Sequence, residues 1–347
     1  MCELYQRVLV NYATRRARPV RAIPQANANS QTSTEIIRRL RGDAMPVQGF
    51  KKSSTTRDLG YHHPMSRVQF QGTNTRMNEK RTIIITGAAS GIGLATAQAL
   101  LGKGHRVTIV DVNEEAIERC QAQLLPNDNV HIIAASASDE EGAARVVAET
   151  TERFGRIEVL FNNAGIGVGS LREDAEVRSP TIEELTPDDY LRFFGVNVLA
   201  AVTMTRACIA SLKSAPWGRI INNTTSYMTM HRVQPYGATK SGLESVSAVW
   251  ADELKDTGIT VNVVVPGGPT DTPMVKNIGL SRQQMLHPGV LAPPIDWLIS
   301  TEADGVTGRR FVAGRWDTSV SPAAAAAKCA RSIGWPELTG DVVWHGR

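Results

Sequence analysis

The stretch Thr82-Ile83-Ile84-Ile85-Thr86-Gly87-Ala88-Ala89-Ser90-Gly91-Ile92-Gly93 decides the fold of this chain. Its first five residues are β-branched, which is typical of a short strand buried on both faces of a sheet. The run Leu94–Leu101 behind the glycines favours a helix. Gly87 permits a tight turn, Gly91 lets the backbone approach a pyrophosphate, and Gly93 allows close packing of the helix. We therefore expect a strand, a phosphate-binding turn and a helix.

An acidic residue ends the next predicted strand. The run Arg106–Val110 leads into Asp111, about 20 residues after the glycine turn. An acid at this place accepts hydrogen bonds from the adenosine ribose hydroxyls and repels a 2′-phosphate. Ala89 and Ser90, within the turn, offer no positive charge to such a phosphate. The pattern favours NAD as the cofactor and keeps NADP as the alternative.

Strand and helix patterns continue to alternate along the chain. Helical patterns cover 114–125 and 140–154, and strand patterns cover 130–134 and 157–161. This alternation predicts an α/β fold, a doubly wound parallel sheet in a single Rossmann-type domain. After the fourth strand, Asn162-Asn163-Ala164-Gly165 places small residues at the carboxyl end of the sheet, where such folds bind ligands.

Two further stretches carry groups able to move a proton. The run Gly218–Ser226 is typical of a strand that ends in hydroxyl residues. Tyr236 and Lys240 follow in helix-compatible sequence, and residues four apart share one helix face. An ammonium beside a phenol favours the phenolate and lowers the phenol pKa from about 10, as a general acid/base near neutral pH requires.

With these motifs in this order, the chain resembles the short-chain dehydrogenase/reductase family over about Thr82–Ala313. The resemblance implies hydride transfer between a nicotinamide cofactor and a carbonyl or secondary alcohol of a small molecule. The motifs that carry it are Thr86-Gly87-x-x-x-Gly91-x-Gly93, Asn162-Asn163-Ala164-Gly165, Tyr236-x-x-x-Lys240 and Pro266-Gly267.

The resemblance also implies roles for individual residues. Tyr236 would be the acid/base, and Lys240 would hold the nicotinamide ribose and lower the pKa of Tyr236. Asn197 matches the family asparagine that supports a proton-relay water. The residues implied in cofactor binding are Gly87, Ser90, Gly91, Ile92, Gly93, Asp111, Asn163, Ala164, Gly165, Tyr236, Lys240, Pro266, Gly267 and Thr272, with Thr270 in reserve for Thr272.

Two departures from the family pattern stand out. The substrate-orienting serine, about 13 residues before the tyrosine in the family, would fall on Asn223, whereas counting along the strand points to Thr225. A shortened loop leaves Thr225 and Ser226 as candidates, and Ser226 is preferred as the less hindered hydroxyl. After the third strand, Ser136-Ala137-Ser138 stands where relatives often carry an acid, so we expect altered affinity for the adenine end of the cofactor.

Residues 1–80 differ from the rest in composition. They contain 14 Lys and Arg against 5 Asp and Glu and show no sustained period. We expect a disordered basic extension before a domain at 81–316 and a C-terminal tail at 317–347. A solvated extension is preferred; an organellar presequence and an arm that touches nucleic acid or anionic lipid are the alternatives. Translation from Met77 is a further interpretation of this segment.

Composition narrows the class of protein. Hydrophobic residues make up 42% and charged residues 21% of the 347 residues, as in ordinary globular proteins. The apolar run Val261–Val265 stops at Pro266, and the sequence predicts no membrane-spanning helix. The four scattered cysteines indicate neither a metal site nor a disulfide framework. We expect a cytoplasmic protein, or a mitochondrial one if the extension is a presequence.

The sequence thus predicts an NAD-preferring oxidoreductase. An NADP-linked 3-oxoacyl-type reductase and a nucleotide-binding regulator without turnover are the rival hypotheses. The family resemblance implies a homodimer or homotetramer. We expect a small-molecule carbonyl or alcohol substrate and no nucleic-acid or membrane partner.

Overall fold

The computed structural model describes residues 80–276 and 278–335. The predicted basic extension therefore lies outside the described residues, apart from Lys80, and so does the end of the tail, 336–347. The interpretations of the extension as a presequence or as a binding arm therefore concern residues that the structure does not describe.

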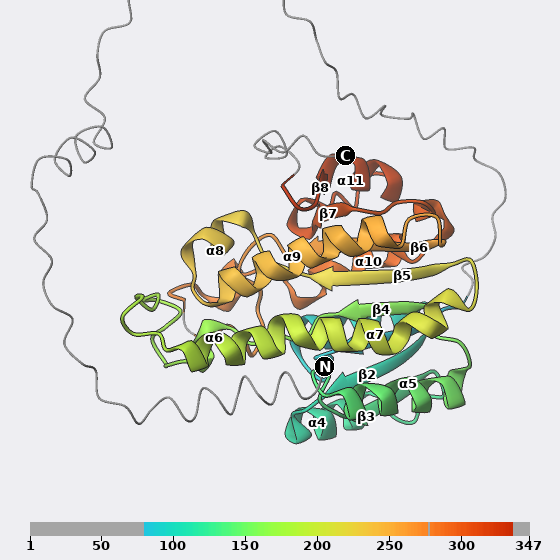
Figure 1. Cartoon of the computed structure of the whole chain (residues 1–347), viewed down its shortest axis with the longest axis horizontal. Coiled ribbons are helices and arrows are strands. Elements are labelled where there is room, and N and C mark those ends of the chain that lie inside the picture. The colour runs from blue at the N-terminus through green and yellow to red at the C-terminus, as the bar shows by residue number, and fades with distance from the viewer. Residues whose placement is uncertain (1–79, 277, 336–347) are drawn as a thin grey trace, which may run out of the picture. The chain divides into compact units, whose positions relative to one another are not determined.

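One sheet runs through the described part of the chain, with its eight strands in the order β3-β2-β1-β4-β5-β6-β7-β8 (Figure 1). Neighbours among the first seven strands are parallel, and β8 pairs antiparallel with β7. The strands are β1 (Thr82–Thr86), β2 (Arg106–Asp111), β3 (Val130–Ala134), β4 (Val159–Asn162), β5 (Gly218–Asn223), β6 (Ile259–Val265), β7 (Arg309–Val312) and β8 (Ala330–Ser332).

Helices cover both faces of this sheet, and the predicted doubly wound fold is confirmed. Helices α5, α7 and α9 lie on the face toward the viewer in Figure 1, and α3, α10 and α11 pack on the other face. The α-helices of the described residues are α3 (Gly91–Gly102), α4 (Glu114–Leu124), α5 (Glu140–Phe154), α6 (Pro187–Phe194), α7 (Ala200–Lys213), α8 (Tyr227–Arg232), α9 (Tyr236–Glu253), α10 (Ala292–Leu298) and α11 (Pro322–Cys329).

Strand β1 lies in the middle of the sheet and explains where a ligand can bind. All five of its residues are buried, with Ile83 and Ile85 in the core on one face and Ile84 in the core on the other. Its neighbours are β2 and β4, so the strand order reverses at β1. In an open α/β sheet the crevice at such a reversal, outside the carboxyl ends of the strands, is the ligand site.

Helices α6 and α7 are joined by a π-helical turn, Gly195–Leu199, into one helix from Pro187 to Lys213. By length and composition alone this helix could cross a membrane, with a mean hydropathy of 1.6 over an 18-residue window, a property that the sequence did not predict. Its side chains Met204 and Cys208 are fully buried in the core shared with β4 and β5. The helix therefore occupies the position of a core helix in a globular domain.

The described part of the tail belongs to the same sheet. Helix α11 packs its residues Ala326 and Cys329 into the core, and β8 follows directly. The sequence gave this tail no role. Strand β8 was missed because three residues, Ala-Arg-Ser, are too short to show a period.

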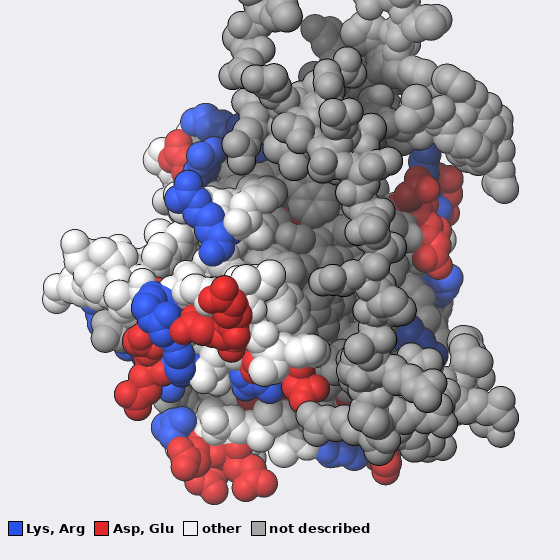
Figure 2. All heavy atoms as spheres, turned by 60° about the vertical axis from the view of Figure 1, so that its left-hand side comes forward, with Lys and Arg blue, Asp and Glu red and all other residues white. Residues whose placement is uncertain are grey.

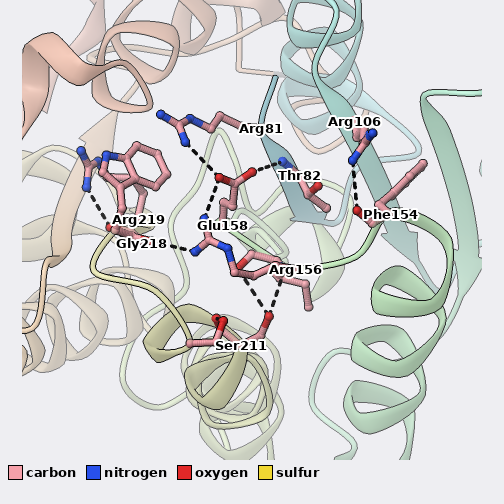
Figure 3. A network of polar contacts seen from close by, with 12 residues as sticks. Arg81, Thr82, Arg106, Phe154, Arg156, Glu158, Ser211, Gly218 and Arg219 are labelled. Atoms are coloured by element: carbon pink, nitrogen blue, oxygen red, sulfur yellow. Dashed lines mark hydrogen bonds and ion pairs between the residues drawn. The ribbon is translucent and has the colours of Figure 1, made fainter. Parts of the chain in front are cut away.

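A network of hydrogen bonds and ion pairs lies at the amino ends of the strands, at the end of the sheet opposite the crevice (Figure 3). Glu158 accepts hydrogen bonds from Arg81 and Arg156, each at 2.9 Å, and from the backbone of Thr82 at 3.0 Å.

The surface of the described residues carries charges of both signs. On the face shown in Figure 2, Lys and Arg side chains lie beside Asp and Glu side chains in mixed clusters.

Candidate active site

The glycine turn between β1 and α3 is shaped by close backbone contacts. Gly87 has φ +61°, and a Cβ there would lie 2.7 Å from the Cα of Ala164. A Cβ on Gly93 would lie 2.5 Å from the carbonyl oxygen of Gly87. Any side chain at either position would therefore push the turn away from the loop after β4 or from helix α3.

The first turn of α3 is suited to bind a phosphate. Its N-cap residue Ser90 makes no side-chain capping bond, and the first turn holds no acidic residue. The backbone N–H groups at a helix N-terminus attract anions when no side chain satisfies them. Gly91, with φ +53°, lies against the side chain of Thr272, which a Cβ on Gly91 would approach to 3.2 Å. The residues present thus fit the pyrophosphate of a dinucleotide.

Asp111 is fixed beside this turn by three backbone amides. Its Oδ2 accepts from Ala89 N at 3.0 Å, and its Oδ1 accepts from Val112 N at 2.8 Å and Asn113 N at 3.1 Å. These bonds hold the carboxylate at the carboxyl end of β2. A ribose next to the turn would meet a fixed negative charge.

Asn163 ties the loop after β4 to the glycine turn. Its Nδ2 donates to the carbonyl oxygens of Thr86 and Gly87, both at 3.0 Å. The hydroxyl of Thr86 in turn accepts from the backbone N–H of Asn163 and of Ala164, both at 3.1 Å. The two predicted motifs are therefore one rigid wall of the crevice, with Gly165 beside Asn197 on its far side.

The proton-transfer groups meet at the end of β5 and the start of α9. The side chain of Thr225 faces the hydroxyl of Tyr236 and acts to lower the pKa of that tyrosine. Ser226 instead caps α8, with its hydroxyl 3.1 Å from Thr229 N and 2.9 Å from Thr229 Oγ1. The structure brings Thr225 and not the preferred Ser226 to Tyr236, because a side chain that caps a helix points along that helix.

Lys240 lies beneath this pair, one turn after Tyr236 on α9. Its Nζ donates to Asn223 O at 2.8 Å and lies 5.8 Å from the centre of the Tyr236 ring. Burial lowers the pKa of Lys240 to about 8. Burial also raises the pKa of Tyr236 to about 12, against a smaller lowering by Thr225. The sequence predicted a lowered tyrosine pKa; in this structure burial outweighs any effect of the ammonium.

Asn197 lies in the π-helical turn and joins three parts of the site. Its Oδ1 accepts from Ile166 N at 2.7 Å, and its Nδ2 donates to Ile166 O at 3.1 Å and Thr239 Oγ1 at 3.0 Å. Thr239 is the neighbour of Lys240 on α9. Asn197 therefore fixes the loop after β4 against the helix that carries Tyr236. π-Helical turns are frequent at functional sites.

The loop after β6 contributes the remaining predicted residues. Gly267 has φ +99°, and Pro266 O accepts from Gly314 N at 2.8 Å, which holds the loop beside the end of β7. Both threonine hydroxyls bond backbone oxygens of their own loop, Thr272 to Thr270 O and Thr270 to Gly268 O. Thr272, 8% exposed, lies against the turn at Gly91 through its Cβ and methyl carbons.

Asn223, the position on which the family serine would fall, has a linking role that the sequence did not predict. Its carbonyl accepts from Lys240, and its Nδ2 donates to Asn163 Oδ1 at 3.0 Å, so it links β5 to the wall of the crevice. The signal was the polar pair Asn222-Asn223 at the carboxyl end of the strand. Ser136 and Ser138 stand where the adenine contact of the cofactor was expected, and their hydroxyl oxygens are hydrogen-bonded to each other at 3.1 Å. Within 80–276 and 278–335, no group of three or more His, Cys, Asp or Glu could hold a metal ion.

Comparison with known proteins agrees with this geometry. The sequence profile described as short chain dehydrogenase matches residues 81–283. The chain is 31% identical to levodione reductase of Leifsonia aquatica over 202 residues, which cover 57% of this chain and 72% of that protein. It is 34% identical to D-threitol dehydrogenase of Mycolicibacterium smegmatis over 251 residues, 67% of this chain and 90% of that protein.

A solved structure shows the same likeness. It is 3-ketoacyl-(acyl-carrier-protein) reductase from Brucella melitensis complexed with NADH, with a TM-score of 0.56 and 28% identity. The match covers 66% of this chain and 94% of that one.

Proposed function

Because the chain belongs to the short-chain dehydrogenase/reductase family, we propose that it transfers a hydride between NAD and a carbonyl or secondary alcohol of a small molecule, with Tyr236 as the acid/base. The observation that carries the proposal is the placement of Tyr236 beside Lys240, whose Nζ lies 5.8 Å from the centre of the Tyr236 ring, with Thr225 facing the tyrosine hydroxyl, at the crevice lined by the glycine turn. When bound, the nicotinamide supplies or accepts the hydride.

The side chains of the protein orient the substrate, move the proton and hold the cofactor. Thr225 donates or accepts one hydrogen bond at the substrate oxygen and orients it toward Tyr236. Tyr236 gives a proton to that oxygen in reduction and takes it in oxidation. Lys240, held by Asn223, is placed to donate to the ribose hydroxyls and to offset negative charge on the phenolate.

The proposed preference for NAD rests on Asp111. Three backbone amides fix its carboxylate next to the turn, where a 2′-phosphate would be placed and repelled. The similarity to a reductase complexed with NADH supports a nicotinamide cofactor.

Titration of the purified protein with NADH and NADPH, followed by fluorescence, tests the cofactor. A panel of ketones and secondary alcohols, with wild type and Tyr236→Phe, tests the chemistry. We expect tighter binding of NADH and turnover that Tyr236→Phe abolishes. Tyr190→Phe is the matched control, since it removes another tyrosine hydroxyl, which donates to Gln234 in the loop before α9. Binding of neither cofactor, or turnover in Tyr236→Phe equal to wild type, would refute the proposal.

We also propose that copies of the chain associate through α6, the π-helical turn and α9. These elements expose large apolar side chains: Leu191 is 69%, Leu199 47% and Val249 61% exposed. Sedimentation of wild type and Leu199→Glu tests this, with a lower mass expected for the variant.

A further inference from the structure

A buried ion pair lies directly behind the candidate active site. Arg310 of β7 and Glu244 of α9 are 2% and 0% exposed, and their Nη1 and Oε2 atoms are 2.5 Å apart. Taking two charges out of water costs free energy that their attraction repays only in good geometry, so a buried pair is weak evidence for stability. The contacts that this pair makes with its surroundings therefore carry the argument.

The last residue of β5, Asn223, and the two residues that follow it are each bonded to a buried charged side chain. This is the segment whose third residue, Thr225, reaches Tyr236. The three contacts are Lys240 Nζ donating to Asn223 O at 2.8 Å, Thr224 Oγ1 donating to Glu244 Oε2 at 3.0 Å, and Arg310 Nη2 donating to Thr225 O at 2.6 Å.

One face of α9 supplies two of these groups together with the acid/base. Tyr236, Lys240 and Glu244 follow one another at intervals of four, so their side chains lie in a row along the helix. Arg310 reaches the same row from β7, with one nitrogen on Glu244 and another on Thr225 O. Its planar fork makes both contacts at once, which a single ammonium does not do.

Aromatic rings cover the pair. The guanidinium of Arg310 lies 4.2 Å from the centre of the Tyr227 ring, and Tyr227 Oη donates to Glu244 Oε1 at 3.3 Å. The ring of Trp335, from the C-terminal tail, lies 6.1 Å from that of Tyr227. The described tail thus reaches the back of the site.

We propose that Arg310 and Glu244 are positioning residues: they hold the backbone at Thr225 so that its hydroxyl meets Tyr236. The consequence for turnover rests on the proposed function, whereas the restraint on the backbone does not. The competing explanation is an ion pair that only stabilises the fold. The two differ in what happens when both charges are replaced together by apolar groups of similar volume.

The decisive variant is the double substitution Arg310→Met with Glu244→Leu. It leaves no buried charge unpaired, and such replacements are often neutral or stabilising. We expect it to unfold at a temperature close to wild type and to bind NADH with unchanged affinity. We expect its kcat to fall roughly tenfold or more, because small displacements of a positioning group are costly.

Hydrogen exchange gives a second readout that needs no substrate. Peptides that cover 224–230 are expected to exchange faster in the double variant than in wild type, with peptides from β2 and α4 as internal controls. Arg310→Lys keeps a charge beside Glu244 but gives up the fork, and we expect wild-type stability with reduced kcat.

The outcomes separate the two proposals. Unchanged exchange at 224–230, or a kcat within twofold of wild type in the stable double variant, overturns the positioning role. Faster exchange in the variant supports that role even where wild type turns over no substrate of the panel; in that case the proposed function alone fails.

Discussion

Thr225 faces the hydroxyl of Tyr236 across the candidate site although the whole of helix α8 lies between them in the chain. Ser226 is the N-cap of α8, so the helix begins directly after Thr225 and Thr225 itself stays outside it. The two neighbouring hydroxyls therefore have different tasks: one faces the acid/base and the other caps a helix.

Substitution of the two hydroxyls separates these tasks. We expect Thr225→Val, which keeps the shape and removes the donor, to lower kcat by roughly 100-fold, because an oriented hydrogen bond to the reacting oxygen is lost. Thr225→Ser should keep most of the activity. Steady-state kinetics with the best substrate of the panel measures both.

Ser226→Ala is the matched control. Loss of the N-cap should lower the free energy of unfolding by about 1 kcal/mol and leave kcat within a few-fold of wild type. If Ser226→Ala were the variant without turnover, the assignment of Thr225 would be wrong.

The lowered pKa of Lys240 predicts how cofactor affinity depends on pH. In the free protein this lysine is charged below about pH 8 and neutral above it. A charged donor binds ribose hydroxyls and a nearby pyrophosphate more strongly than a neutral one, so bound cofactor raises the lysine pKa. The Kd for NADH should therefore increase above about pH 8, by roughly threefold to tenfold. Fluorescence titrations between pH 6.5 and 9.5 measure it.

Lys240→Met should bind NADH more weakly at every pH and show no such increase. The same pH dependence in the methionine variant would assign the effect to another group.

The fold was predictable because its signals are local. The β-branched run of β1, the glycines after it and the acid that ends β2 each act within a few residues. Strand β8 was not predicted because its signal is not local: Ala330–Ser332 forms a strand by pairing with the edge of β7. Pairing across an edge leaves little trace in a three-residue stretch.

The site was predictable in its residue types and less so in its details. Spacing placed Tyr236 and Lys240 on one helix face, as found. It left Thr225 and Ser226 as candidates and preferred Ser226, because the spacing does not show where α8 begins. Nor could it weigh burial against a neighbouring charge, which decides the pKa of Tyr236. Glu244, one turn beyond Lys240, was visible in the spacing, but its partner Arg310 comes from a distant strand.

The network at the amino ends of the strands predicts a stability effect remote from the site. Glu158, with a side chain 12% exposed, pairs with Arg81 and Arg156, and Arg81 also lies 3.9 Å from the centre of the Trp217 ring. Glu158→Gln removes the carboxylate that the two guanidinium groups share. We expect the free energy of unfolding, measured in urea, to fall by about 2–4 kcal/mol, with NADH affinity unchanged.

Glu140→Gln is the control for this change. Glu140 pairs with Arg206 at 2.8 Å, but both side chains are more than 70% exposed, and such pairs contribute little. Equal losses in the two variants would show that burial of the network does not matter.

Asp111 predicts the ratio of the two cofactor affinities. Its fixed carboxylate should repel a 2′-phosphate and bond the hydroxyl that NAD carries there. In Asp111→Asn the repulsion disappears while the acceptor for Val112 N and Asn113 N is kept. We expect weaker NADH binding, tighter NADPH binding and a ratio of the two Kd values that shifts by roughly tenfold or more.

Asp139→Asn is the control, because it changes the net charge equally and lies after the neighbouring strand β3. Asp139 caps α5 through Gly142 N at 2.8 Å, and because Asn is an equally good N-cap, this substitution should leave both the stability and the ratio of Kd values nearly unchanged. A shift of similar size in both variants would mean that net charge near the crevice sets the preference. A shift in Asp111→Asn alone would assign the preference for NAD to this one carboxylate and to the backbone amides that hold it.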